Sequence, residues 1–360
     1  MSQKGFPFFQ EGAKRFEKAM KGVPDRVPVL AQMHEFAMNE IGAKANQFYT
    51  SPELLVPATL EIQEKYGLDI PFLDYDVYNI EAEGIGQEII YSEYSMPDVN
   101  RTKPLIRVQD DLRKIKTPDF NSAGRFGHVI EMNRIFRRLI GGGTETGLSF
   151  CAPFSLAANI RGIEQLLMDI YDDPSFARSL FDRVTEDVLV PWILCLKKEF
   201  PNAGAVVGSD AVSSLPIVNL NILREWIVPY IMRLRKICGP EVYVPNWVGE
   251  SHLKEPGQML DLKRQVCPGF VEGQDPDVER LGPEYYKQYA QKHGLPLILG
   301  VGASFLASSG PEKVVERVRH YIDIGGENGR FALYLCNLGA TTPAENVKAV
   351  IETVLTHGVY

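Results

Sequence analysis

The feature that most constrains this chain is a repeated alternation of short apolar runs with longer amphipathic stretches. Runs that are apolar on both faces are typical of parallel strands covered on two sides. After Pro24 eight such runs occur, and each ends in, or is directly followed by, a small or polar residue. The runs are Val27–Gln32, Ile70–Leu73, Gly147–Ala152, Ala205–Gly208, Val242–Pro245, Phe270–Glu272, Leu297–Leu299 and Phe331–Leu335. Helical spacing characterises the stretches around them, which are Gly12–Lys21, Pro52–Tyr66, Ile163–Met168, Pro174–Phe200, Leu220–Ile237, Pro311–Ile324 and Pro343–Leu355.

Eight strands, each followed by a helix, predict an α/β fold of the (β/α)₈ TIM barrel type. The chain of 360 residues fits that barrel with an insertion, which we place at Tyr75–Thr144 between the second and third strands. The alternating segment Gln87–Tyr94 predicts an extra hairpin or edge strand there. Because no linker divides the chain, we expect residues 1–360 to form a single domain. The rival fold, an open doubly wound sheet, is disfavoured because no GxGxxG motif follows the first run.

Charge and cysteine content narrow the class of function. The chain has 38 Lys and Arg against 46 Asp and Glu, a formal net charge of −8, which argues against nucleic-acid and anionic-membrane partners. No apolar run approaches the ~20 residues that cross a bilayer. The five cysteines are scattered and contain no CxxC pair, so we expect no disulfide framework and a reducing cytoplasm. The sequence leaves the oligomeric state open.

In a barrel of this type the reactive groups follow the strands, at their carboxyl ends. Acids, a histidine and cysteines at one rim are suited to acid–base chemistry or to holding a metal. The residues at these positions, in chain order, are His34 and Glu35; Asp74, Tyr75 and Asp76; Cys151 and Ser155; Ser209 and Asp210; Asn246, Trp247, Glu250 and His252; Glu272, Gln274 and Asp275; Gly300 and Gly302; and Cys336 and Asn337.

Structural roles remain open for several of them. His34 is equally a hydrogen-bonded rim residue, and Asp210 is placed to cap the next helix. Cys336 ends an apolar strand, as an inert packed thiol would. The Gly300–Gly302 segment fits either a tight turn or a close approach of backbone to a ligand. Aromatic residues near the rim suit a flat ligand or ordinary packing; these are Tyr75, Tyr78, Phe154 and Trp247.

Ordered segments from about Arg26 to Val354 resemble the uroporphyrinogen decarboxylase superfamily. The segments are Asp25-Arg26-Val27-Pro28-Val29, Asn79-Ile80-Glu81-Ala82-Glu83-Gly84-Ile85-Gly86, Pro153-Phe154-Ser155-Leu156-Ala157, Gly208-Ser209-Asp210, Leu299-Gly300-Val301-Gly302 and Thr342-Pro343-Ala344-Glu345-Asn346-Val347. That superfamily includes the corrinoid-dependent methyltransferases that act on methanol, methylamines and methoxylated aromatics. The resemblance implies a (β/α)₈ barrel, in agreement with the strand count.

The resemblance is closer to the methyltransferase branch. The decarboxylases carry two arginines in an N-terminal stretch, where they clamp substrate carboxylates; the corresponding Gln32–Met38 contains no arginine. The Glu81–Gly86 segment resembles the methyltransferase motif, and Cys336 stands six residues before Thr342, as a zinc-ligating cysteine of that branch does. The branch's His-x-Cys pair, however, falls on Asn246 and Val248, which are not zinc ligands of that kind.

A different zinc set therefore remains possible. Glu250 and His252 offer carboxylate and imidazole donors, and Cys336 completes three protein ligands with an open fourth position, as catalytic zinc requires. The alternative is that Glu250 and His252 are solvated loop residues.

Together these features predict a methyltransferase that passes a methyl group from a small donor, preferably an aryl methyl ether, to the cobalt of a separate corrinoid protein. From their positions after the strands, we expect His34, Asp210 and Asn246 to be the catalytic residues. We expect Tyr75, Phe154, Trp247, Gly300 and Gly302 to lie against the substrate. Two alternatives stay open. One is a uroporphyrinogen decarboxylase-type lyase using Asp210, and the other is a non-catalytic barrel that binds a corrinoid or another small molecule.

Overall fold

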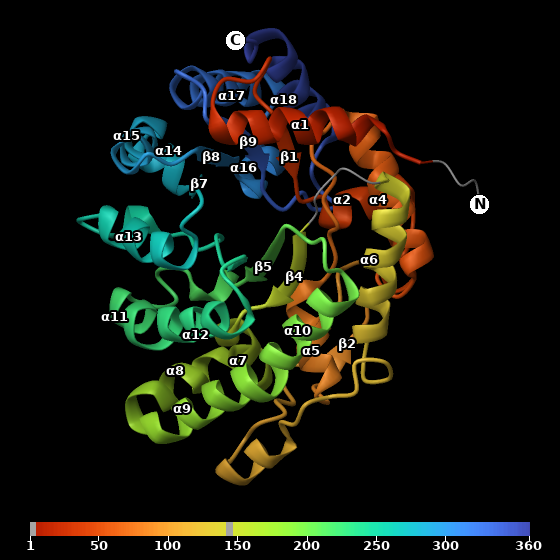
Figure 1. Cartoon of the computed structure of the whole chain (residues 1–360), viewed down its shortest axis with the longest axis vertical. Coiled ribbons are helices and arrows are strands. Elements are labelled where there is room, and N and C mark those ends of the chain that lie inside the picture. The colour runs from red at the N-terminus through yellow and green to blue at the C-terminus, as the bar shows by residue number, and fades with distance from the viewer. Residues whose placement is uncertain (1–4, 142–146) are drawn as a thin grey trace.

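Parallel strands form two sheets at the centre of the molecule (Figure 1). A computed structural model describes residues 5–141 and 147–360. The larger sheet has the order β1-β9-β8-β7, and the smaller has the order β4-β5-β6. Their bounds are β1 (Val29–Ala31), β9 (Phe331–Leu335), β8 (Leu297–Val301), β7 (Val271–Gln274), β4 (Gly147–Cys151), β5 (Ala205–Ser209) and β6 (Val242–Tyr243). These strands confirm seven of the eight predicted runs and the α/β class with parallel pairing.

The remaining prediction, a strand at Ile70–Leu73, is wrong. Pro71 has no N–H to donate to a ladder. The backbone of the next residue is held by a helix side chain instead, because Gln63 Nε2 donates to the Phe72 carbonyl oxygen at 2.7 Å and the Phe72 N–H donates to Gln63 Oε1 at 3.0 Å. The segment pairs with no strand, and no ladder joins the two sheets within the part of the chain that the structure describes.

Helices cover the outside of both sheets (Figure 1). They are α1 (Phe8–Lys21), α2 (His34–Glu40), α3 (Ala45–Phe48), α4 (Pro52–Tyr66), α5 (Val77–Gly84), α6 (Phe126–Ile140), α7 (Pro153–Arg161), α8 (Ile163–Asp172), α9 (Pro174–Arg183), α10 (Val190–Glu199), α11 (Leu220–Ile222), α12 (Val228–Cys238), α13 (Gly257–Val266), α14 (Asp277–Leu281), α15 (Pro283–His293), α16 (Ala303–Ser308), α17 (Pro311–Gly325) and α18 (Ala344–His357). Short π turns at Val184–Leu189 and Leu223–Ile227 divide two stretches that the sequence predicts as continuous helices. Among the described residues, no helix combines the length and apolar character that crossing a bilayer would require.

Local sequence signals account for the bounds of α4, which match the prediction. The Ser51 side chain accepts a hydrogen bond from the Leu54 N–H and caps the helix, and Pro52 occupies the first turn, where its missing N–H costs nothing. Gly67 ends the helix at a φ of 73°, a left-handed conformation that glycine adopts without a steric penalty.

The segment predicted as an insertion contains α5, a short antiparallel ribbon, a 3₁₀ helix (Gln109–Lys114) and α6. The ribbon pairs β2 (Ile89–Ile90) with β3 (Asp98–Val99) and includes part of the predicted Gln87–Tyr94 segment. The predicted end of the insertion, Thr144, lies outside the described residues.

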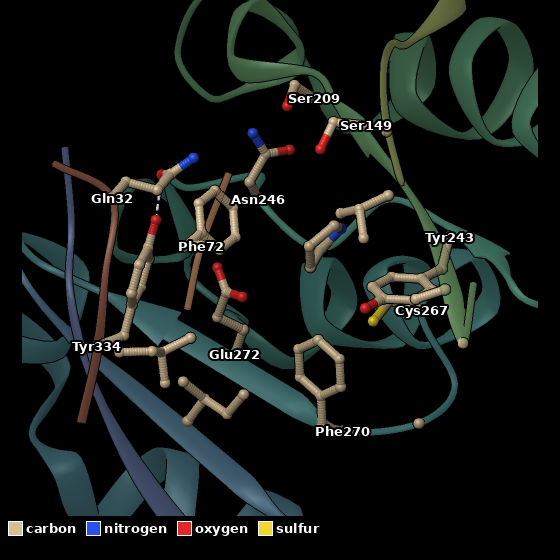
Figure 2. A pocket seen from close by; sticks show the side chains of 18 of the residues that line it. Gln32, Phe72, Ser149, Ser209, Tyr243, Asn246, Cys267, Phe270, Glu272 and Tyr334 are labelled. Carbon is tan, nitrogen blue, oxygen red and sulfur yellow. Dashed lines mark hydrogen bonds between the residues drawn. The ribbon is translucent and has the colours of Figure 1, made fainter. Parts of the chain in front are cut away.

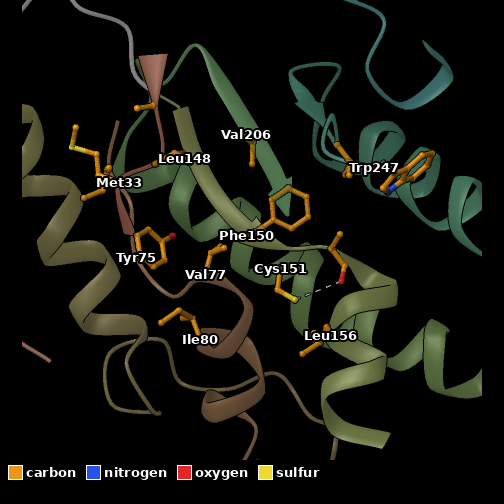
Figure 3. Close-up of a cluster of buried hydrophobic side chains, with 14 of the residues drawn as sticks. Met33, Tyr75, Val77, Ile80, Leu148, Phe150, Cys151, Leu156, Val206 and Trp247 are labelled. Atoms are coloured by element: carbon orange, nitrogen blue, oxygen red, sulfur yellow. Dashed lines mark hydrogen bonds between the residues drawn. The ribbon is translucent and has the colours of Figure 1, made fainter. Parts of the chain in front are cut away.

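Strand residues alternate between the outer helices and the space between the sheets. Leu148 and Phe150 of β4 pack with Ile80 of α5 and Leu156 of α7 in the buried core (Figure 3). The intervening residues of the smaller sheet face the other way. In β5 the alternation is complete: Val206 is fully buried, whereas Ala205 and Val207 are only partly buried. The space between the sheets is therefore not filled by side chains.

Candidate functional site

A cavity of about 620 Å³ lies between the two sheets and is lined by residues from both. It runs from the segments that precede the strands to the residues that follow them, and most of its wall is apolar or aromatic. Figure 2 shows the polar side chains that face it; these are Gln32, Ser149, Ser209, Tyr243, Asn246, Glu272 and Tyr334. Cavities that bind small molecules commonly combine an apolar wall with a few such polar groups.

Glu272 is the acid that projects into the middle of this cavity (Figure 2). It stands on β7, and among the described residues its side chain receives one hydrogen bond, which Gln274 Nε2 donates to Oε1 at 2.5 Å. Burial raises the pKa of Glu272, and the nearby Lys263 ammonium partly opposes that rise. A carboxyl group in such surroundings is suited to hold and release a proton.

Lys263 fixes the backbone on both sides of this acid. Its Nζ donates to the carbonyl oxygens of Trp247 and Glu272, at 2.8 and 2.7 Å, and to Glu250 Oε1 at 2.8 Å. The side chain is 5% exposed, so a single buried cation ties the segment after β6 to β7.

His34 lies at the carboxyl end of β1, against Asp74. The His34 N–H donates to Asp74 Oδ2 at 2.6 Å, and the ring Nδ1 lies 3.1 Å from the same oxygen. The other ring nitrogen, Nε2, is 3.0 Å from Asn337 Oδ1. Asp74 lines the cavity, and burial raises its pKa, with His34 opposing the rise. The structure thus brings His34 next to a carboxyl group at the rim of the cavity.

Asp210 is fully buried, and its carboxylate is occupied by donors from its own wall. Ser155 donates to Oδ1 through its backbone N–H at 3.1 Å and its Oγ at 2.8 Å. Trp247 Nε1 donates to Oδ2 at 3.0 Å. Asp210 is absent from the cavity wall, so the structure places this predicted acid as an organiser of the loops after β4, β5 and β6.

Asn246 lines the cavity and joins it to that network. Its Oδ1 accepts a hydrogen bond from the Asp210 N–H at 3.1 Å, and its Nδ2 lies 3.2 Å from the Tyr78 hydroxyl as a donor. The Tyr78 hydroxyl also accepts from the Ala211 N–H at 3.1 Å. The amide is held in one orientation, and it presents a neutral polar group to the cavity.

The predicted aromatic residues separate into two groups. Tyr75 lines the cavity, and its hydroxyl donates to the Ser149 carbonyl oxygen at 3.1 Å. Phe154 is stacked on Phe181 with ring centroids 5.8 Å apart, and Trp247 has no exposed surface. Neither Phe154 nor Trp247 lines the cavity, because the packing of helices against β4 and the Asp210 network take up their rings.

Gly300 and Gly302 serve the packing of strand ends. A Cβ on Gly300 would lie 2.5 Å from Cys336 Sγ and 3.0 Å from Gln274 Cγ, and one on Gly302 would lie 2.8 Å from Asp275 Cβ. The Gly302 N–H also donates to Asp275 Oδ2 at 3.1 Å. These glycines let the segments after β7, β8 and β9 approach closely, and neither lines the cavity.

The predicted zinc donors do not come together. Within residues 5–141 and 147–360, the structure contains no group of three His, Cys, Asp or Glu side chains able to hold a metal. Glu250 is buried in an ion pair with Lys263, whereas His252 is exposed. Cys336 packs against Gly300, and burial raises the pKa of its thiol well above the usual value. These residues do not fit a zinc ion, and no step of the chemistry below uses one.

Glu81, from the Glu-Ala-Glu segment, is another buried acid. Its Oε1 accepts a hydrogen bond from the Cys151 N–H at 3.0 Å, and burial raises its pKa to about 8. The side chain is 1% exposed and does not line the cavity. Glu81 therefore holds the end of β4 close to α5 as a carboxyl group that keeps its proton near neutral pH.

Sequence reasoning put Glu272 and Gln274 among the rim residues, with Glu272 only as a further possible metal donor, and it passed over Gln32, Ser149 and Tyr334. The signal for these residues is their position: polar groups on strands otherwise apolar on both faces. Gln32 and Tyr334 come from neighbouring strands of one sheet, and the tyrosine hydroxyl donates to the glutamine Oε1 across the cavity wall (Figure 2).

Comparison with known proteins agrees with this architecture. The profile of the family described as uroporphyrinogen decarboxylase (URO-D) matches residues 11–357. A curated uroporphyrinogen decarboxylase from Anaeromyxobacter sp. (strain Fw109-5) is 23% identical, with 94% of this chain and 97% of the relative covered. A methyltransferase from Methanosarcina mazei shares the fold with a TM-score of 0.77 at 20% identity, over 96% of this chain and 98% of the other. The match over nearly the whole length confirms the resemblance seen in the sequence, and the chain belongs to the uroporphyrinogen decarboxylase (URO-D) family.

Proposed function

We propose that this protein is a corrinoid-dependent methyltransferase that takes a methyl group from a methoxylated aromatic compound. The acceptor is the cobalt of a corrinoid carried by a separate protein, which acts as a second substrate. The proposal treats the two sheets as the wall of one (β/α)₈ barrel with residues 75–144 inserted, in a chain that works in a reducing cytoplasm. The fold shared with the Methanosarcina mazei methyltransferase is compatible with this function.

One observation carries the proposal: the polar end of the cavity offers acids and neutral amides. Asp74 supplies a carboxyl group there, and Glu272 supplies another in the middle of the cavity. The only cations among the described lining residues, Arg235 and Arg330, belong to segments at the opposite end, and their guanidinium groups donate to the carbonyl oxygens of Val242 and Gly294. A polycarboxylate substrate needs cationic partners, whereas an uncharged aromatic ether fits an apolar wall with a few hydrogen-bonding groups.

The cavity also contains a group that can assist the leaving oxygen. In the transfer, the bond between the ether oxygen and the methyl carbon breaks and leaves its electron pair on oxygen, while the methyl group forms a bond to the acceptor. The reduced corrinoid supplies the attacking electron pair. We assign Glu272 as the acid that gives its proton to the departing oxygen, because its raised pKa keeps the carboxyl protonated at higher pH. Asn246 orients the ether within the cavity.

Methyl transfer from a set of methoxybenzenes to reduced free cobalamin, and to a reduced corrinoid protein, tests the proposal. The expected result is conversion of the reduced cobalt absorbance to that of the methylated form, with release of the corresponding phenol. Release of carbon dioxide from uroporphyrinogen without methyl transfer would replace the proposal with a decarboxylase. Tight binding of ethers without turnover, in the presence of both acceptors, would replace it with a binding protein.

A further inference from the structure

The cavity extends past the polar end along the whole length of the strands. The residues at its far end precede β5, β6, β7 and β8, and they include Gly204, Pro240, Phe270 and Pro296. Parallel strands begin at the same edge of a sheet, so these residues mark the amino-terminal end. A strand of five residues rises by about 16 Å. The cavity is therefore a bore of roughly that length, longer than a methoxybenzene ring needs.

The two halves of the bore differ in chemistry. Asn246 and Asp74 lie in the half at the carboxyl ends of the strands, and Glu272, which is in register with Ile298, projects into the middle of the bore. Phe16 and Met20 of α1 line the amino-terminal half, and, like Leu30 and Phe270, they pack against a buried cluster that includes Ile298. The two arginines in this half already donate to backbone carbonyl oxygens. One half can thus hold a polar head group, and the other offers mainly apolar surface.

The side chains of β4 and β5 leave the bore unfilled on their side. The wall built from β4 and β5 presents three small side chains and one valine, namely Ser149, Ala205, Ser209 and Val207. Barrels of this type are usually filled by layers of bulky branched residues. These four residues are partly exposed, whereas their neighbours in the same strands that face the helices are buried. The empty volume therefore results from the size of the side chains on that wall.

We propose that the bore binds an apolar alkyl or alkenyl tail on the methyl donor, with the methoxy-bearing ring held between Glu272 and Asn246. The inference rests on the proposed methyl transfer and specifies its substrate class: elongated aryl methyl ethers that carry a hydrocarbon chain opposite the methoxy group. Such a tail replaces water along the apolar half of the bore. Ethers that lack the tail leave that half without an apolar partner.

Binding of a homologous series tests this without the corrinoid partner. Dissociation constants for 4-alkyl anisoles with zero to six tail carbons are measured by calorimetry on the complete chain. Each methylene that enters the bore is expected to tighten binding by up to about fourfold. A dissociation constant that does not change with tail length would overturn the inference, even if methyl transfer from anisole itself is observed.

A plug in the apolar half provides the matched comparison. Ala205 lines the bore at the start of β5, so Ala205→Phe is expected to abolish most of the gain from tail length. Leu194→Phe on α10 adds the same ring on the surface, where Leu194 is 44% exposed, and should keep the gain. Val207→Phe is the second plug if the first variant does not fold. Undiminished length dependence in a folded plug variant would place the tail elsewhere and refute the inference.

The two proposals fail separately. Length-dependent binding without methyl transfer supports the bore and refutes the methyltransferase. Methyl transfer with binding that is independent of length supports the methyltransferase and refutes the bore.

Discussion

The Asp210 and Glu272 regions place buried carboxyl groups in opposite situations. Asp210 follows β5 and receives three hydrogen bonds from Ser155 and Trp247, with no surface on the cavity. Glu272 lies within β7. Its side chain receives one hydrogen bond and faces the cavity. Burial raises the pKa of both groups.

The comparison shows that burial and a raised pKa do not identify a reactive acid. What differs is the number of donors that the protein itself supplies. A carboxylate whose oxygens are already occupied holds neighbouring loops in place, and its removal leaves those donors unpaired. A carboxyl group with free oxygen atoms beside a cavity can exchange a proton with a ligand.

Replacement of Asp210 is the strongest test of the difference. Asp210→Ala leaves two N–H groups and one hydroxyl without their acceptor, at about 1–3 kcal/mol for each buried group. We expect the free energy of unfolding to fall by about 4 kcal/mol, measured by urea denaturation. Glu272→Gln is the matched control, since it keeps the oxygen that accepts from Gln274 and should change that free energy by less than about 1 kcal/mol. Equal losses in the two variants would contradict the distinction.

Glu81 sharpens the comparison as an intermediate case, with one backbone donor and no access to the cavity. Its pKa is about 8 in the folded chain against 4.5 for an ordinary glutamate. Between these two values the Glu81 carboxyl binds more protons in the folded state than in the unfolded state. The contribution of Glu81 to the free energy of unfolding is therefore fully present below pH 4.5 and is lost as pH rises toward 8. Glu81→Gln should remove a loss of roughly 3 kcal/mol between pH 5 and 8.

Unfolding free energies at several pH values check this expectation. The exposed Glu352, on α18, supplies the control, because Glu352→Gln should leave the pH dependence as it is in the wild type. A wild-type stability that stays flat from pH 5 to 8 would show that Glu81 is ionised in the folded chain.

Glu272→Gln should reduce methyl transfer by about 100-fold, because the amide occupies the same space but gives no proton to the leaving oxygen. The dissociation constant of the ether should change little. In the wild type the rate should fall as pH rises through the raised pKa of Glu272, and this limb of the profile should vanish in the variant. Wild-type rates in the variant would move the proton donor elsewhere, with His34 beside Asp74 as the next group to replace.

Cys336→Ala gives the smallest expected effect. The Cys336 thiol packs against Gly300 and does not line the cavity, so its loss should alter the methyl-transfer rate by less than about threefold. Zinc content, measured by plasma mass spectrometry, should be equally low in the variant and the wild type. One zinc per chain in the wild type and none in the variant would overturn the structural assignment of this cysteine.

Chain pattern predicted the parallel α/β architecture well, because apolar runs and helix signals are local. It failed at Ile70–Leu73, where the Gln63 side chain, on α4, forms hydrogen bonds with the N–H and the carbonyl oxygen of Phe72. Of the residues that follow strands, Asn246 and Tyr75 line the cavity, whereas His34 lies against Asp74, which lines it. Chain position could not distinguish Asp210 from Glu272, since the direction of a side chain depends on donors far away in sequence.

The bond between Gln63 and Phe72 bears on how this family can diversify. Where neighbouring strands share a ladder, the spacing of the wall is set by backbone geometry. At Phe72 a side-chain amide sets it, and Phe72 faces the cavity. A substitution on α4 can therefore change the girth of the binding space while every paired strand keeps its register, which gives related chains a simple route to ligands of other sizes.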